Sequence, residues 1–332
     1  MEPIRVGLVA DPASPTAVAR RMTNLVPPGA AGRGGWDIQL LSEPFTLGTE
    51  DVDTALSRLR TERGRRQWEL VIGVTELPLR DDDGGYLLAA IDPQRQSAVL
   101  SLPALGGFRV QTRARDAVRG LISGMTEPRS SEEQRVPLPG LSGRGRVLMG
   151  MVLANRPWLL AAGLKSALVA ALATGAVATI QPTVWELAAS LSGWRLVVAT
   201  IASIMIVVAW IVIDGELWNR PENGSAQAWE RSRLYNASTL LTLTAGVVIC
   251  YAVLYVVNLA WALFVLDPDV LGGSLGESVG YGDLFVLTWF VASVATLGGA
   301  LGTGLESDEA IRAAAYSKRE EVRRARLAAE PA

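Results

Sequence analysis

The chain contains no histidine, and Cys250 is its only cysteine. Without histidine it can have no imidazole general base, no Ser-His catalytic pair and no His-ligated zinc. A single cysteine inside a hydrophobic run excludes both an internal disulfide and a cysteine metal cluster. The sequence therefore predicts no catalytic residue, no metal site and no bound cofactor. These absences argue against an enzyme without settling the question.

Lysine is almost absent as well, since only Lys165 and Lys318 among the 31 basic residues are lysines. Such one-sided use of arginine is typical of a GC-rich bacterial genome rather than of a binding surface. The formal net charge is −2. No nucleic-acid partner is predicted.

Apolar residues, by contrast, are abundant and unevenly distributed. Residues 1–146 are mixed, whereas most of residues 157–305 are apolar. About 20 apolar helical residues cross a hydrocarbon core of about 30 Å. Four stretches approach or exceed this length, which predicts an all-α transmembrane four-helix bundle over residues 147–305. The predicted spans are about 158–180, 196–213, 240–266 and 284–305.

Arginines beside these spans indicate the orientation, because cytoplasmic loops carry the excess of positive residues. The flanks expected inside contain Arg144, Arg146, Arg156, Arg220, Arg231, Arg233, Arg319, Arg323, Arg324 and Arg326, whereas the opposite loops contain only Arg195. The opening residues, MEPIRVGLVADPASP, do not have the basic segment and apolar core of a signal peptide. We therefore expect a multi-pass protein of the cell membrane with both termini in the cytoplasm.

Residues 1–128 alternate between strand and helix patterns, which predicts a cytoplasmic α/β domain with a mixed sheet. Strand patterns cover 4–10, 36–41, 69–76 and 97–102, and helix patterns cover 16–24, 50–66 and 112–125. No glycine-rich turn follows the first strand, which argues against dinucleotide binding. Residues 129–146 are rich in Pro, Ser and Gly and predict a linker. Residues 306–332 predict a basic cytoplasmic tail helix whose arginines can contact anionic lipid headgroups.

Three segments of this domain, IGVTELPL (72–79), AVLSLPAL (98–105) and RDAVRGLIS (115–123), resemble successive motifs of the archaemetzincin-like zinc proteases. Those motifs are a strand of the form L-G-V-T-D-x-D-L, an extended segment V-I-S-L-x-R-L, and the zinc helix K-E-A-V-H-E-L-G-H. The resemblance covers roughly residues 4–129 and implies a metzincin-like fold.

The same resemblance implies that the zinc site has been lost. Arg119 and Ser123 stand at the first two histidine positions, Gly120 at the general-base glutamate and Arg129 at the third ligand. Two arginines would repel a cation rather than bind it. The resemblance thus implies a pseudoprotease module with a scaffold, binding or regulatory role at the bilayer and an unidentified protein partner.

Two other functions stay open. One is a small oligomeric transporter or channel, and the other is an enzyme that holds Mg²⁺ on Asp81, Asp82 and Asp83. Adjacent residues on a strand point to opposite faces, and the run lacks the alternating spacing of a calcium loop. A solvated turn completed by Gly84 and Gly85 is the interpretation we prefer.

Polar residues within the predicted spans are candidates for a functional face. Tyr251, Tyr255 and Asn258 share one helical face, where they could line a cavity or bond to a neighbouring helix. Lys165 lies about 10 Å from the predicted start of its span at 1.5 Å per residue, close enough to reach the headgroups.

Two further candidates concern contacts at the membrane. Arg231, Arg233, Tyr235 and Asn236 form a predicted interfacial cluster, either a lipid-phosphate or partner site or an aromatic and basic anchor. Gly298 and Gly302 form a small-residue pair that permits close helix packing within the bundle or in a homo-oligomer.

Overall fold

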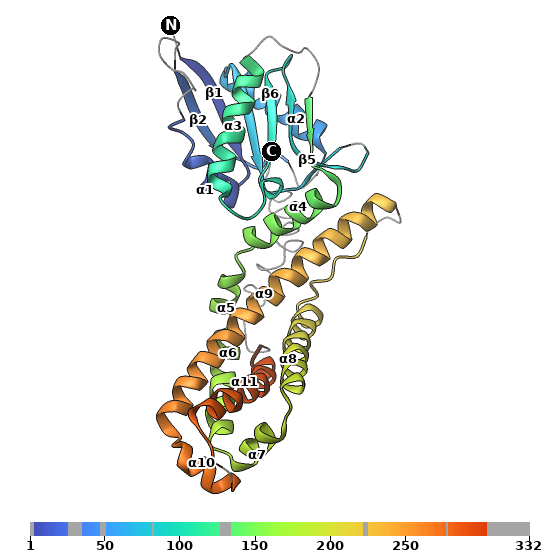
Figure 1. Ribbon diagram of the computed structural model, residues 1–332. Helices are drawn as coiled ribbons and strands as arrows, with labels where there is room; N and C mark the ends of the chain where they lie inside the picture. Colours follow the sequence, from blue (N-terminus) through green and yellow to red (C-terminus); the bar gives the residue numbers. More distant parts are fainter. Residues whose placement is uncertain are drawn as a thin grey trace. The chain divides into compact units, whose positions relative to one another are not determined.

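The computed structural model describes residues 3–25, 35–46, 51–81, 83–126, 134–221, 225–276 and 278–303. They form two compact units that divide the chain after Ala154, an α/β unit and a helical unit (Figure 1). The predicted tail helix of residues 306–332 and Arg129 lie outside the described residues.

A mixed sheet of seven strands forms the centre of the α/β unit, in the order β2-β1-β3-β6-β5-β4, with β7 also paired to β5. The parallel strands are β1 (Ile4–Ala10), β2 (Trp36–Ser42), β3 (Leu70–Thr75) and β6 (Ser97–Ser101). The antiparallel strands are β4 (Leu79–Arg80), β5 (Tyr86–Asp92) and β7 (Gln134–Pro137). Strands β3 and β6 are fully buried, which explains why their sequences are continuous apolar runs.

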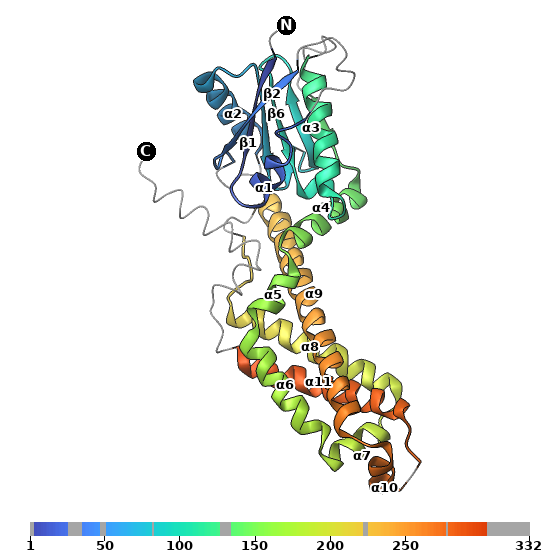
Figure 2. The same cartoon turned by 90° about the vertical axis from the view of Figure 1, so that its left-hand side faces the viewer.

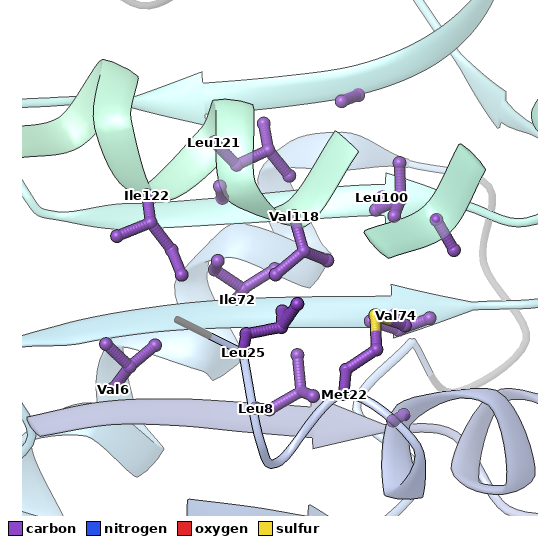
Figure 3. Packing of buried hydrophobic residues seen from close by; sticks show 14 of the residues in the cluster. Val6, Leu8, Met22, Leu25, Ile72, Val74, Leu100, Val118, Leu121 and Ile122 are labelled. Carbon is purple, nitrogen blue, oxygen red and sulfur yellow. The ribbon is translucent and has the colours of Figure 1, made fainter. Parts of the chain in front are cut away.

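Helices cover both faces of this sheet. Helices α1 (Ser14–Arg20) and α3 (Val110–Thr126) pack on one face, and α2 (Val52–Arg66) packs on the other, as Figure 2 shows for α2 and α3. Figure 3 shows Val118 and Ile122 of α3 packed with Ile72 and other core residues. The predicted α/β alternation and the apolar face of α3 are confirmed.

The segment predicted as a linker, residues 129–146, is largely structured where it is described. Residues 134–137 form β7, and α4 (Gly140–Ala154) packs on the short 3-10 helix η1 (Pro103–Leu105). A Cβ atom on Gly150 would lie only 2.2 Å from the Pro103 carbonyl oxygen. Within the predicted linker itself, a Cβ on Gly143 would lie 2.7 Å from Leu138 Cβ. The segment therefore packs as part of the fold, and the unit extends to Ala154 rather than to residue 128.

The helical unit contains α5 (Pro157–Gly163), α6 (Lys165–Thr179), α7 (Pro182–Ser190), α8 (Gly193–Asp214), α9 (Ala226–Val265), α10 (Pro268–Leu275) and α11 (Tyr281–Thr303). Among the described residues, α8, α9 and α11 are long and apolar enough to cross a membrane. A fourth crossing results only if Gly140–Leu160 and Lys165–Thr179, which are bent by 59° at their break, count as one broken span.

Two of the predicted spans differ from the observed helices. The first, 158–180, is interrupted at Leu164, whose φ of −91° and ψ of 45° are not helical. The third begins at Ala226 rather than near residue 240, and Ser225 caps it by accepting a hydrogen bond from the Ala228 amide. Its 40 residues extend about 60 Å at 1.5 Å per residue, so α9, the long orange helix in Figure 1, is about twice as long as a hydrocarbon core.

Small residues bring α6 and α11 together. A Cβ on Gly298 would lie 2.8 Å from Thr174 Oγ1, and one on Gly299 would lie 3.0 Å from Ala171 Cβ. The close approach that Gly298 permits is therefore made within the chain. The side chains at residues 300–303, including position 302, lie outside the described set.

Candidate functional site

The carboxyl ends of the four parallel strands meet at one edge of the sheet. Because β2 lies on one side of β1 and β3 on the other, the chain direction across the sheet reverses there, and open α/β sheets bind ligands at such a point. Asp11 directly follows β1, and Thr75 ends β3. This edge is the first place to look for a site.

Asp11 is completely buried at this edge and accepts hydrogen bonds from three groups. Its Oδ1 accepts from the Phe45 amide at 3.2 Å, while its Oδ2 accepts from the Thr46 hydroxyl at 3.0 Å and the Thr75 hydroxyl at 2.6 Å. Burying a carboxylate is costly unless such donors replace water. The side chain thus joins the ends of β1 and β3 to the segment after β2.

The hydrogen bonds continue from Thr75 across the edge. Thr75 Oγ1 accepts from the Leu77 amide at 3.0 Å, and Ser101 at the end of β6 donates to the Leu77 carbonyl at 2.8 Å. On the other side, Thr16 Oγ1 bonds to the Asp11 carbonyl at 2.9 Å. These hydrogen bonds hold the segments that follow β1, β2 and β3 in place, and the polar groups take one another as partners. We call Asp11, Thr16, Thr46, Thr75 and Ser101 the edge network.

The positions that correspond to the zinc helix lie on α3. Arg119 is half-buried and lies 3.7 Å from a carboxylate oxygen of Asp116, Gly120 is exposed, and Ser123 is half-buried. Their neighbours Val118 and Ile122 turn to the sheet. Within the described part of the chain, no three His, Cys, Asp or Glu side chains lie close enough to share a metal ion.

Asp81 and Asp83 belong to the turn between β4 and β5. The Asp81 amide donates to the Gly85 carbonyl at 2.8 Å, and Gly84 adopts a φ of 79° that favours glycine. Asp83 is exposed, Asp82 lies outside the described residues, and Asp81 forms an ion pair with Arg135 of β7. Asp81 thus has a structural partner in the segment that the sequence predicted as a linker.

Tyr251 lies in a hydrogen-bonded group within the helical unit, together with Thr200 of α8 and Trp289 and Ser293 of α11. The Thr200 hydroxyl lies 3.2 Å from the Tyr251 hydroxyl and 3.1 Å from that of Ser293, and it accepts from Trp289 Nε1 at 2.8 Å. We call these four residues the helix network. The sequence identified Tyr251 but missed its three partners.

The other residues of the predicted polar face are separated. Asn258 is buried and donates to the Leu254 carbonyl at 2.8 Å, and its amide covers Gly175 of α6, where a Cβ would lie 2.3 Å from Asn258 Oδ1. Tyr255 is half-buried. Lys165 is the first residue of α6 and is exposed. Tyr251 and Asn258 therefore make contacts between helices, whereas Lys165 is exposed and takes no part in these contacts.

The predicted interfacial cluster also divides. Tyr235 and Asn236 are buried in α9, whereas Arg233 is exposed and Arg231 is half-buried. Asn236 holds the chain after α8, because its Oδ1 accepts from the Asn219 amide at 2.8 Å and its Nδ2 donates to the Asn219 carbonyl at 3.0 Å. Tyr235 and Asn236 therefore have structural roles inside the fold, whereas Arg231 and Arg233 remain available at the surface.

Comparison of the chain with protein-family models, with curated proteins and with solved structures finds no match.

Proposed function

We propose that the chain is a multi-pass membrane protein whose α/β unit is a non-catalytic binding or scaffold module of metzincin-like descent, held at the cytoplasmic face. The observation that carries this proposal is the composition of α3. Its apolar face packs on the sheet, while Arg119 and Ser123 occupy the half-buried positions at which the resemblance implies zinc ligands. A helix that keeps its packing without ligands suits binding better than hydrolysis.

The order of the elements supports the metzincin-like part. The three resembling segments fall on β3 with the start of β4, on β6 with η1, and on α3, the same order in which the family places two extended segments and its zinc helix. The edge network supports the absence of catalysis, because its buried carboxylate bonds to three donors of the fold.

The topology rests on the bent pair Gly140–Leu160 and Lys165–Thr179 forming one broken span, which makes the number of crossings even. Both termini then lie in the cytoplasm, in agreement with the arginine distribution. The polar start of α9, with Trp229, Arg231 and Arg233, suits a helix that extends from the hydrocarbon core into the headgroup region.

A transporter or channel remains the second candidate. The helix network favours it only weakly, because its groups bond to one another, as in polar contacts that hold membrane helices together. If Lys165→Ala, Tyr255→Ala and Asn258→Ala together left every solute flux unchanged in cells that depend on the protein, this candidate would be abandoned.

Crosslinking in the native membrane, followed by affinity purification, tests the scaffold proposal. We expect the full chain and residues 1–154 to retain the same protein, and residues 155–332 not to retain it. The soluble piece should end at Ala154 because α4 packs on η1. Stoichiometric zinc in the purified full chain, together with metal-dependent proteolysis, would contradict the proposal.

A further inference from the structure

The described residues of the α/β unit expose four large apolar side chains, all between positions 108 and 149. Among its described residues these are Phe108, Val136, Leu141 and Met149, with Phe108 at 71% and Leu141 at 84% exposure. Phe108 lies in the loop before α3, and the other three lie in β7 and α4, the segment that leads toward the helical unit. Grouped exposed apolar side chains mark an interaction surface more often than scattered ones do.

Glycine contacts fix the loop that carries Phe108. A Cβ on Gly107 would lie 1.9 Å from Leu153 Cδ1, so the loop packs directly against the last turn of α4. Gly106 has a φ of 81°, a conformation that glycine adopts without strain. Phe108 therefore projects from a loop that is held beside the end of α4.

Arginines surround the same loop. Arg109 is exposed, Arg113 donates to the Leu105 carbonyl at 2.7 Å, and the side chain of Arg146 on α4 also lies beside Gly106. The sequence has no Asp or Glu within residues 102–115 or 134–185. This part of the chain thus adds positive charge with no carboxylate of its own.

Two of these arginines stand where a positive charge is locally unfavourable, although Arg113 gains the hydrogen bond to Leu105. Arg109 and Arg113 stand at the N-terminal end of α3, whose first turn contains no acidic residue, and a positive charge there opposes the helix macrodipole. Arg109 also has a φ of 53°, which costs energy for a residue with a Cβ. Features that oppose the local preference suggest a function.

This surface is close along the chain to the first predicted membrane segment. Only Asn155 and Arg156 separate α4 from α5, and three residue steps extend at most about 11 Å. Helix α5 begins with exposed Trp158 and Leu159, side chains suited to a bilayer interface. Phe108 therefore belongs to a loop that packs on Leu153, four residues before α5 begins at Pro157.

We propose that Phe108, Arg109, Arg113, Arg146 and Met149 form a docking surface by which the α/β unit binds anionic lipid headgroups, with the Phe108 ring inserted among them. The inference rests on the proposed membrane anchorage and not on the metzincin-like descent. The arginines attract the negative surface, and this attraction acts over a Debye length of about 8 Å at physiological salt. Phe108 adds apolar contact area once the surface is close.

Hydrogen–deuterium exchange of the full chain in nanodiscs tests this surface. With phosphatidylglycerol added to phosphatidylcholine, we expect the amides of residues 106–113 to exchange about fivefold more slowly, and high salt to reverse the effect. The variant F108S/R109E should lose the lipid-dependent protection. The matched control R58E makes the same charge change on the exposed surface of α2 and should keep it.

Exchange in β3 serves as the folding control and should be the same in all variants. An absence of lipid dependence, an equal loss in R58E, or protection that appears only in native membranes and thus indicates a protein partner would each overturn the proposal. Both leaflets of a nanodisc carry the same lipid, so the result does not depend on topology. Zinc content and partner capture are measured separately, which keeps failure of the docking surface distinct from failure of the proposed function.

Discussion

The α/β unit and the helical unit bury polar groups by different means. In the α/β unit a buried carboxylate, Asp11, bonds to donors from Phe45, Thr46 and Thr75, which lie up to 64 residues away. In the helical unit, buried hydroxyls and amides bond mainly to carbonyls of their own helix or to a few hydroxyls on facing helices. In the α/β unit the buried carboxylate holds together loops that are distant in sequence. In the helical unit the polar side chains join helices whose backbone hydrogen bonds are already made within each helix.

The two units also differ in what they expose. Four of the exposed large apolar side chains belong to the described part of the α/β unit, and all the others belong to the helical unit. A surface of valine, isoleucine and tryptophan suits helices surrounded by lipid. Both units thus bury apolar clusters, and the described helices of the helical unit also expose apolar side chains, as contact with lipid permits.

The largest effect should come from removing the carboxylate of the edge network. Asp11→Ala leaves two buried hydroxyls and an amide without their acceptor, and we expect a loss of about 3 kcal/mol in the free energy of unfolding of the α/β unit. Chemical denaturation of residues 1–154 measures it. Asp83→Ala, at an exposed turn position, is the control and should change the value by less than about 0.5 kcal/mol.

Next in size is the contrast between two helix glycines. An alanine Cβ at Gly150 would meet the Pro103 backbone at 2.2 Å, whereas one at Gly175 would meet the Asn258 side chain at 2.3 Å. Because a side chain can move and a backbone carbonyl cannot do so cheaply, we expect Gly150→Ala to cost about 2 kcal/mol and Gly175→Ala about 1 kcal/mol. Unfolding of the full chain in mixed micelles, followed separately for each unit by hydrogen exchange, compares them. A larger cost at Gly175 would show that the helical unit is the more rigid one.

The helix network should contribute less than the edge network. Thr200→Val keeps the shape but removes the acceptor for Trp289 Nε1 and the partner of two hydroxyls, at a cost of about 1 kcal/mol by analogy with other polar contacts in membranes. Thr200→Ser keeps the hydroxyl and should retain most of this stability. A loss as large as that of Asp11→Ala, measured by unfolding in mixed micelles, would contradict the comparison.

The smallest effect concerns pH and the start of α2. The Thr54 hydroxyl donates to the Asp51 carboxylate and lowers the pKa of that group below its ordinary value of 3.8. Since the folded pKa is depressed, the stabilisation is present at neutral pH and is lost as the pH falls below 3.8 through the folded pKa. Asp51→Ala should cost about 0.5 kcal/mol at pH 7 and less near pH 3. Asp51→Asn, which caps without titrating, should show a smaller cost at pH 7.

The sequence predicted the regular parts of the fold and missed the contacts that join them. The parallel strands and the three helices on the sheet carry clear patterns. The strand YLLAAID was missed because it follows a turn and does not alternate, and QRVP was interpreted as linker because an edge strand needs few apolar residues. The break at Leu164 was missed because the apolar residues continue through it.

The candidate sites were harder to predict, for a physical reason. Tyr251 and Asn258 could be identified because a polar residue in an apolar run is conspicuous. The partners of Tyr251 lie on α8 and α11, and Gly175, which Asn258 covers, lies on α6. Asp11 gave no signal, since its donors at Phe45, Thr46 and Thr75 are brought together only by the order of the strands. The ion pair of Asp81 with Arg135 likewise depends on β7 pairing with β5.

The central claim, a membrane-anchored protein with its α/β unit in the cytoplasm, is tested most directly by cysteine labelling in intact cells. In a Cys250→Ser background, Asp83→Cys in the α/β unit and Ser192→Cys between α7 and α8 each provide one exposed thiol. We expect a membrane-impermeant maleimide to label position 192 in intact cells and position 83 only after the membrane is permeabilised. Labelling of position 83 in intact cells, with position 192 protected, would contradict the account.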